Sequence, residues 1–150
     1  ECLFKGEAEY DSIRTVKQSV SIPIIANGDI TDPLKARAVL DYTGADALMI
    51  GRAAQGRPWI FREIQHYLDT GELLPPLPIA KVQQIMQKHV RELHDFYGQG
   101  KGTRIARKHV SWYLKEHAPD DQFRRSFNAI EDASEQLEAL EAYFENFLRK

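Results

Sequence analysis

Two short polar motifs in this chain have the composition of phosphate-binding turns. Asn27-Gly28-Asp29 follows an apolar run over residues 20–26, and Gly51-Arg52 follows a second apolar run over residues 47–50. A glycine lets backbone N–H groups approach a ligand closely, and an arginine guanidinium can bind two phosphate oxygens at once. Asn and Asp can bond ligand hydroxyl groups or their own turn, so an ordinary strand-to-helix turn is the alternative for the first motif. For the second motif, the alternative is a surface arginine beside a tight turn.

A strand–helix–strand unit is predicted to position these motifs. The two apolar runs are typical of strands that are buried on both faces, as in parallel sheets. Between them, Thr31-Asp32-Pro33 has the residues that begin a helix, and Gly44 is suited to end one. Neighbouring parallel strands have their carboxyl ends at the same edge of a sheet, and the last loops of an α/β barrel bind phosphate at that edge. A helix after Gly51 would add backbone N–H groups that can bind the phosphate. Two strands cannot cover both faces of such a sheet, so the sequence predicts a truncated α/β barrel.

A proline-rich segment predicts a domain boundary at residues 75–78. Pro75, Pro76 and Pro78 favour extended backbone and exclude a continuous helix. Residues 1–74 are then the C-terminal portion of a barrel, and residues 79–150 are a bundle of helices. Outside the strand–helix–strand unit, helices are predicted over 9–19, 58–70, 79–97, 103–116, 121–129 and 131–148. Gly98, Gly100 and Gly102 are expected to separate the helices over 79–97 and 103–116.

Positive charge is concentrated in residues 101–125, although the net charge of the chain is −2. The segment has seven basic residues against three acidic ones, which the overall composition hides. The basic residues are Lys101, Arg104, Arg107, Lys108, Lys115, Arg124 and Arg125. Helical spacing places those at 104, 107, 108 and 115 on one face, which predicts binding to a nucleic-acid backbone through phosphate contacts. A solvated helix face is the alternative.

Composition argues against several classes of protein for this chain. It is 43% hydrophobic and 28% charged, which is typical of a globular domain, and its apolar runs are too short for a membrane span. The single cysteine, Cys2, rules out an internal disulfide framework, and the histidines have no ligand spacing, so we expect no metal site. A reducing, cytoplasmic setting is expected. The sequence begins with Glu1 in place of Met, so the true N-terminus is expected to lie upstream.

Several strings in the chain resemble the tRNA-dihydrouridine synthase family. IPIIANGDI and GADALMIGRAAQGRPWIF are similar to the end of the flavin-binding barrel of that family. The strings LPPLP, ELHDFYG, RIARKHVSWYL and FNAIEDASEQLEALEAYF continue the similarity through the helical part. The resemblance covers essentially the whole chain.

The resemblance implies a function in two parts. In this family a TIM barrel holds FMN, a helical domain helps to grip tRNA, and NADPH reduces the flavin that reduces a uridine to 5,6-dihydrouridine. It implies that Asn27, Gly28, Asp29, Gly51 and Arg52 line the phosphate and ribityl end of FMN. It also implies RNA contact by the seven basic residues at 101–125.

The resemblance also implies that this chain lacks the reacting half of the enzyme. The catalytic acid of the family is a cysteine in an Asn-x-Gly-Cys-Pro motif, and this sequence has no such motif; Cys2 does not match it. We therefore expect no catalytic residue here, no activity from the chain alone, and a full-length enzyme that is monomeric. The alternatives are a non-catalytic helical RNA-binding module and a fragment of another phosphate-binding TIM-barrel enzyme.

Overall fold

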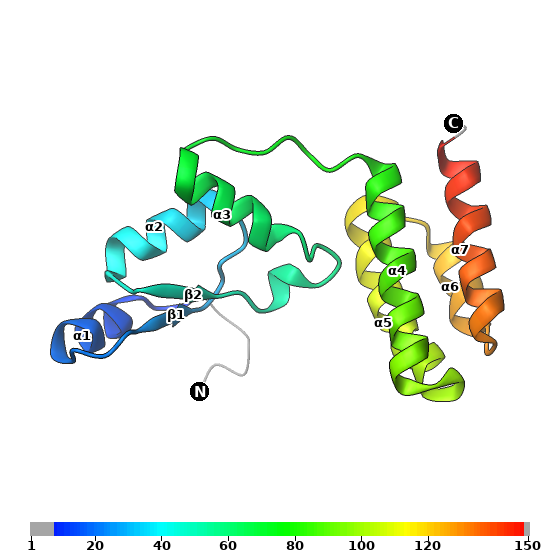
Figure 1. Ribbon diagram of the computed structural model, residues 1–150, viewed down its shortest axis with the longest axis horizontal. Helices are drawn as coiled ribbons and strands as arrows, with labels where there is room; N and C mark the ends of the chain where they lie inside the picture. Colours follow the sequence, from blue (N-terminus) through cyan, green and yellow to red (C-terminus); the bar gives the residue numbers. More distant parts are fainter. Residues whose placement is uncertain (1–7, 149–150) are drawn as a thin grey trace. The chain divides into compact units, whose positions relative to one another are not determined.

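The computed structural model describes residues 8–148 and divides into two compact units (Figure 1). The first unit is Glu1–Pro75 and the second is Pro76–Lys150, so the division falls inside the proline-rich segment. The first unit mixes helices with a small parallel sheet, and the second is entirely helical in its described residues. No helix in residues 8–148 combines the length and the apolarity needed to cross a membrane.

The first unit contains the predicted strand–helix–strand arrangement. Its elements are α1 (Asp11–Ser19), β1 (Ile25–Asn27), α2 (Pro33–Thr43), β2 (Ala47–Met49), the 3₁₀ turn η1 (Arg52–Ala54) and α3 (Ile60–Thr70). The strands are parallel, with Ile25 opposite Ala47 and Asn27 opposite Met49. The strand predicted over 20–26 is shorter and begins later than expected. Pro23 has no N–H to donate to a neighbouring strand, and backbone pairing begins only around Ile24, whose carbonyl accepts from the residue 47 amide at 3.3 Å.

Local sequence explains where α2 begins and ends. The Asp32 side chain accepts a hydrogen bond from the backbone N–H of Lys35 at 2.8 Å, which caps the first turn, and Pro33 occupies the first helical position. Gly44 ends the helix at φ +69°, a left-handed conformation that a glycine adopts without strain. The predicted start and stop signals of this helix are therefore confirmed.

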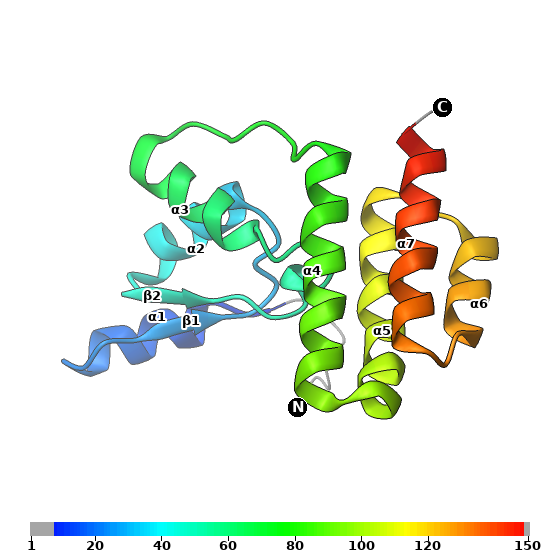
Figure 2. The ribbon, with the colours of Figure 1, turned by 45° about the vertical axis from the view of Figure 1, so that its right-hand side comes forward.

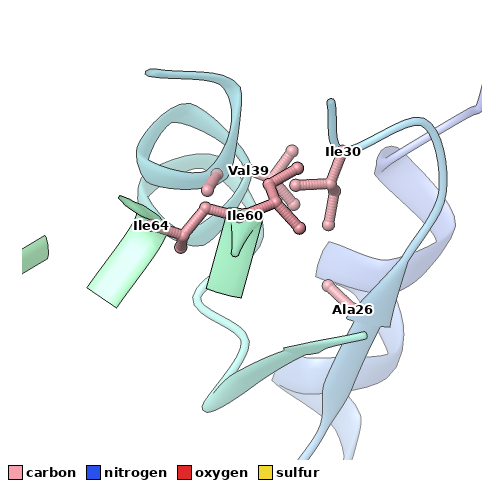
Figure 3. Packing of buried hydrophobic residues seen from close by; sticks show 6 residues of the cluster. Ala26, Ile30, Val39, Ile60 and Ile64 are labelled. Atoms are coloured by element: carbon pink, nitrogen blue, oxygen red, sulfur yellow. The ribbon is translucent and has the colours of Figure 1, made fainter. Parts of the chain in front are cut away.

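The core of the first unit lies on one face of the sheet. Its buried members are Ala26, Ile30, Ala36, Val39, Ile60 and Ile64. In Figure 3, Val39, Ile60 and Ile30 meet between the helices, and Ala26 approaches them from β1. Successive side chains of a strand point to opposite faces of the sheet, so the neighbours of Ala26 lie on the other face. On that face Ile25 of β1 is 64% exposed and Met49 of β2 is 57% exposed. Within the described chain, the sheet thus has one covered face and one open face.

The second unit is a set of four helices that lie side by side (Figures 1 and 2). They are α4 (Ile79–Tyr97), α5 (Gln99–His117), α6 (Asp121–Ala129) and α7 (Ala133–Leu148). Their shared core includes fully buried Met86, Val90, Val110, Phe127 and Phe144. The helices predicted over 79–97 and 121–129 are confirmed at both ends by α4 and α6.

The break between α4 and α5 is much shorter than predicted. Only Gly98, at φ +75°, separates the two helices, and α5 continues through Gly100 and Gly102. A Cβ atom at residue 102 would lie 2.8 Å from the His94 Cα and 2.8 Å from the Leu93 carbonyl oxygen. The glycine at 102 therefore permits a close approach of the two helices and does not end a helix.

A buried polar network also joins three of these helices. The Nε2 group of Gln136 donates to the carbonyl oxygen of Thr103 at 3.2 Å, and the Oε1 atom lies 2.9 Å from Nε2 of His94. Because an amide oxygen can only accept, His94 must carry its proton on Nε2 to complete the bond. The network fixes α4, α5 and α7 to one another inside an otherwise apolar core.

Candidate functional site

An ion pair joins the two polar motifs at the carboxyl edge of the sheet. Nη2 of Arg52 donates to Oδ1 of Asp29 at 2.8 Å, although the two residues lie on different loops. The other carboxylate oxygen of Asp29 accepts from the backbone N–H of Ala8, also at 2.8 Å. Both oxygens of Asp29 are thus engaged within the protein, and the side chain of Arg52 remains 59% exposed. The structure therefore brings these two residues together, as the parallel topology requires.

Gly28 is needed because another segment of the chain crosses it closely. It has φ +140°, and a Cβ atom there would lie only 2.6 Å from the Cβ of Ala8. The hydroxyl of Tyr10 donates to the carbonyl oxygen of Gly28 at 2.6 Å, and Asp29 follows at φ +44°. The conformational freedom of Gly28 therefore serves the packing of residues 8–10, a use that sequence reasoning did not foresee.

Tyr10 is a site residue that the sequence analysis missed. Its hydroxyl holds the turn at Gly28, and Nζ of Lys35 lies 5.0 Å from the centre of its ring. A lone tyrosine ahead of a helix carries no local signal that it will contact a turn 18 residues later. The fold shows the connection, because the residues just before α1 lie against the turn after β1.

The remaining predicted residues of this edge lie at the surface. Asn27 is exposed at the end of β1, where it lies opposite Met49 of β2. Gly51 is exposed as well, but the predicted helix immediately after it is wrong: a single 3₁₀ turn follows, and α3 begins only at Ile60. The carbonyl oxygen of Gly51 accepts from Ala54 at 3.1 Å within that turn. Among these residues the guanidinium of Arg52, and not a helix terminus, is the group suited to bind an anion.

Four of the predicted basic residues form an exposed row on α5. Lys101, Arg104, Lys108 and Lys115 are all exposed, and their spacing places them along one side of the helix. The opposite side carries Ala106, Val110, Tyr113 and Leu114, which are buried. We call these four exposed cations the basic row.

Two arginines of the same segment are engaged within the protein. Nη2 of Arg107 donates to the carbonyl oxygen of Ile130 at 2.9 Å, and its Nε atom is buried without a hydrogen-bond partner. Arg107 therefore ties α5 to the connection between α6 and α7. Arg124 pairs with Asp121 at 3.0 Å on α6, and Arg125 is exposed. The basic residues predicted to bind RNA thus include exposed cations and arginines that bond to other parts of the protein.

Aromatic side chains accompany the basic row. Nζ of Lys101 lies 5.0 Å from the ring centre of Tyr97, and Nζ of Lys108 lies 5.1 Å from that of Trp112. Trp112 also lines a shallow cavity of about 520 Å³, together with Lys115, Arg124 and the acidic pair Asp120 and Asp121. A surface that alternates cations with aromatic rings can contact both phosphates and bases of a nucleic acid.

A cluster of partly buried histidines lies beside this row. The rings of His89 and His109 are 4.6 Å apart, and Nδ1 of His89 lies 3.2 Å from the hydroxyl of Tyr113. Burial lowers the pKa of both histidines, and the pKa of His109 is lowered further by His89 and Lys108. Burial also raises the pKa of Tyr113 to about 12. Among the described residues, no group of three His, Cys, Asp or Glu side chains could hold a metal ion.

Comparison with known proteins relates both units to one family. The family model described as "Dihydrouridine synthase (Dus)" matches residues 1–148. The tRNA-dihydrouridine synthase B of Proteus vulgaris is 99% identical over all 150 residues, which are 46% of that protein. The proteins of the same name from Salmonella typhimurium and Escherichia coli K12 are 88% identical over 146 residues, 97% of this chain and 46% of theirs. The chain therefore spans about half the length of the curated relatives it matches.

Proposed function

The chain belongs to the dihydrouridine synthase family, and we propose that it is the C-terminal part of a flavin-dependent tRNA-dihydrouridine synthase of the B type. The complete protein would reduce a uridine of tRNA to 5,6-dihydrouridine, with FMN as cofactor and NADPH as reductant. The observation that carries this proposal is the 99% identity, over the whole chain, to a protein named for that activity. We expect the complete enzyme to be cytoplasmic and monomeric.

The proposed architecture is a truncated FMN-binding TIM barrel followed by a tRNA-binding helical domain. Residues 1–74 would be the last βα units of the barrel, 75–78 the boundary, and 79–150 the helical domain. The open face of the sheet supports this assignment, because exposed Ile25 and Met49 are apolar residues that strands from the rest of a barrel would cover. The family match extends through both units, which disfavours another barrel enzyme with an unrelated helical appendage.

The edge residues have the donors that the phosphate end of FMN needs. A guanidinium has five N–H donors, so Arg52 can bind a phosphate while it also contacts Asp29. Asn27 is exposed at the same edge and would bond a ribityl hydroxyl, and Gly28 and Gly51 would bring backbone close to the ligand. A carboxylate repels a phosphate, so Asp29 would orient Arg52 and not contact the phosphate itself. FMN supplies the hydride chemistry when it is bound.

The basic row would bind the tRNA backbone. Lys101, Arg104, Lys108 and Lys115 are exposed on one side of a rigid helix, and Arg125 is exposed on α6. Contacts of this kind position a folded RNA without reading its sequence, which suits an enzyme that acts on one nucleotide of a folded substrate. Arg107 and Arg124, which have partners within the protein, would contribute less to RNA affinity.

Incubation of the complete protein with FMN, NADPH and an unmodified tRNA transcript tests the proposed activity. We expect mass spectrometry to detect a uridine that has gained two hydrogens, and no product when NADPH is omitted. Failure of the flavin-loaded protein to modify total tRNA from cells that lack this enzyme would contradict the proposal. The 150-residue chain alone should form no dihydrouridine; product from it would contradict the assignment of the reacting half to missing sequence.

A further inference from the structure

The corner between α4 and α5 presents an aromatic pair to solvent. Phe96 is 80% exposed, more than any other large apolar side chain in the described residues, and the neighbouring Tyr97 is 39% exposed. Their ring centres are 4.8 Å apart in a T-shaped arrangement. A phenylalanine exposed to this degree does not stabilise the fold by burial, so its ring is available to contact another molecule.

The corner that carries the aromatic pair is a tight turn with a backbone hydrogen bond of its own. Gly98 is the only residue between the two helices, and its carbonyl oxygen accepts from the backbone N–H of Gly102 at 2.7 Å. Gly102 in turn allows the helices to approach each other closely. The aromatic pair therefore lies at the point where α4 and α5 are closest in sequence and packed against each other.

Positive charge continues directly from this corner. Nζ of Lys101 lies 5.0 Å from the ring centre of Tyr97, and exposed Arg104 follows three residues later on the same side of α5. Three acidic residues lie near the corner: Glu92, one turn earlier on α4, is paired with Lys88 at 3.6 Å, Asp132 accepts a hydrogen bond from Gln99, and Asp95 precedes Phe96. The aromatic pair is thus the end of the basic row, and not part of a broad apolar surface such as protein interfaces use.

We propose that Phe96 is a stacking platform for an unpaired base of the RNA, with Lys101 and Arg104 on the flanking phosphates. Bases that are not paired expose flat π faces that stack on aromatic side chains, and cations beside the ring hold the backbone on either side. The inference rests on the proposed function, because it assigns one base contact to the surface that would bind tRNA. It adds to the phosphate contacts an interaction that a duplex cannot make.

Binding of an unmodified tRNA transcript to the complete protein tests the stacking role. Phe96→Ala and Phe96→Leu should each weaken the Kd at least about fivefold, since both remove the aromatic face, whereas Phe96→Trp should bind at least as tightly as wild type. The slope of log affinity against log salt should stay unchanged in all three, because no phosphate contact is lost. Phe147→Ala, which changes another exposed aromatic residue, should bind like wild type.

A photocrosslink provides a second measurement that does not depend on affinity. With p-benzoylphenylalanine at position 96, crosslinks should map to an unpaired nucleotide of the tRNA. Crosslinks to paired stems alone, or wild-type affinity of both Phe96→Ala and Phe96→Leu, would overturn the inference. A change in oligomeric state or thermal midpoint with tRNA affinity intact would also overturn it, and would identify the corner as a protein contact.

The same experiment separates failure of this inference from failure of the proposed function. If Arg104→Ala with Lys108→Ala weakens tRNA binding while the Phe96 variants do not, only the stacking role fails. If the wild-type protein neither binds tRNA nor forms dihydrouridine, the proposed function fails and the inference falls with it.

Discussion

At the scale of single residues, arginines on one helix differ in what they contact. Arg104 is exposed, whereas Arg107 donates to the carbonyl oxygen of Ile130 at 2.9 Å. Their spacing in the sequence places both on one predicted face. The acceptor for Arg107 lies 23 residues further along the chain, so no local pattern reveals it.

Replacement of these two arginines should affect the stability of the protein to different extents. Arg107→Ala should lower the free energy of unfolding by about 1–2 kcal/mol, because a hydrogen bond from a charged donor to a partly buried carbonyl is lost. Arg104→Ala should change it by less than about 0.5 kcal/mol, as is usual for an exposed side chain. Urea denaturation of the complete protein measures both. Equal losses of stability would contradict the structural role of Arg107.

At the scale of elements, local sequence predicted the helices well where their ends are chemically marked. The helix over 79–97 lies between a proline and Gly98, and the helix over 121–129 has Asp120, whose side chain accepts from Phe123 at 2.8 Å. The start of α5 could not be predicted in the same way. Three glycines are typical of a helix break, but Gly102 is required by the contact with α4.

A pair of glycine substitutions in α5 tests this explanation. Gly102→Ala should destabilise the complete protein by about 1–3 kcal/mol, because the new Cβ atom would meet backbone atoms of α4 at 2.8 Å. Gly100→Ala is the matched control. A methyl group at residue 100 would have no atom of a neighbouring segment within 4 Å, so this change should be neutral or stabilise the helix by up to about 1 kcal/mol. A tolerated Gly102→Ala would contradict the close approach.

The contact between α4 and α5 should also be sensitive to acid. The pKa values of His89 and His109 lie below the ordinary 6.5, mainly because of burial, so the unfolded chain takes up protons first as pH falls. Stability from the neutral histidines is therefore present above pH 6.5 and is lost below it. Urea midpoints at about pH 7 and about pH 5 measure the loss of stability. The loss should be smaller in a variant with both His89→Gln and His109→Gln than in wild type. An unchanged pH dependence would contradict this assignment.

At the scale of the whole molecule, the sequence predicted which polar motifs meet but not how they are held. Parallel strands bring Asp29 and Arg52 to one edge, and this followed from the strand–helix–strand pattern alone. The crossing of Gly28 by residues 8–10, and the short turn after Gly51, depend on contacts between distant segments. The truncated barrel that we propose would account for the open face of the sheet, and the chain spans 46% of the length of its near-identical relative.

The central proposal is that the two units have separate tasks: the first would hold the phosphate end of FMN, and the second would hold the backbone of tRNA. Each task is assigned to exposed cations of one unit, Arg52 in the first and the basic row in the second. Substitutions in the complete protein should therefore weaken the binding of one ligand and leave the binding of the other unchanged.

Measurement of FMN retention and tRNA affinity on the same two variants tests this claim most directly. Arg52→Ala should weaken FMN binding about tenfold or more and leave tRNA affinity of the flavin-loaded protein unchanged. Arg104→Ala with Lys108→Ala should retain FMN, weaken tRNA binding and reduce its salt slope by roughly one unit per lost phosphate contact. Wild-type FMN retention in the first variant, or a wild-type salt slope in the second, would contradict the claim.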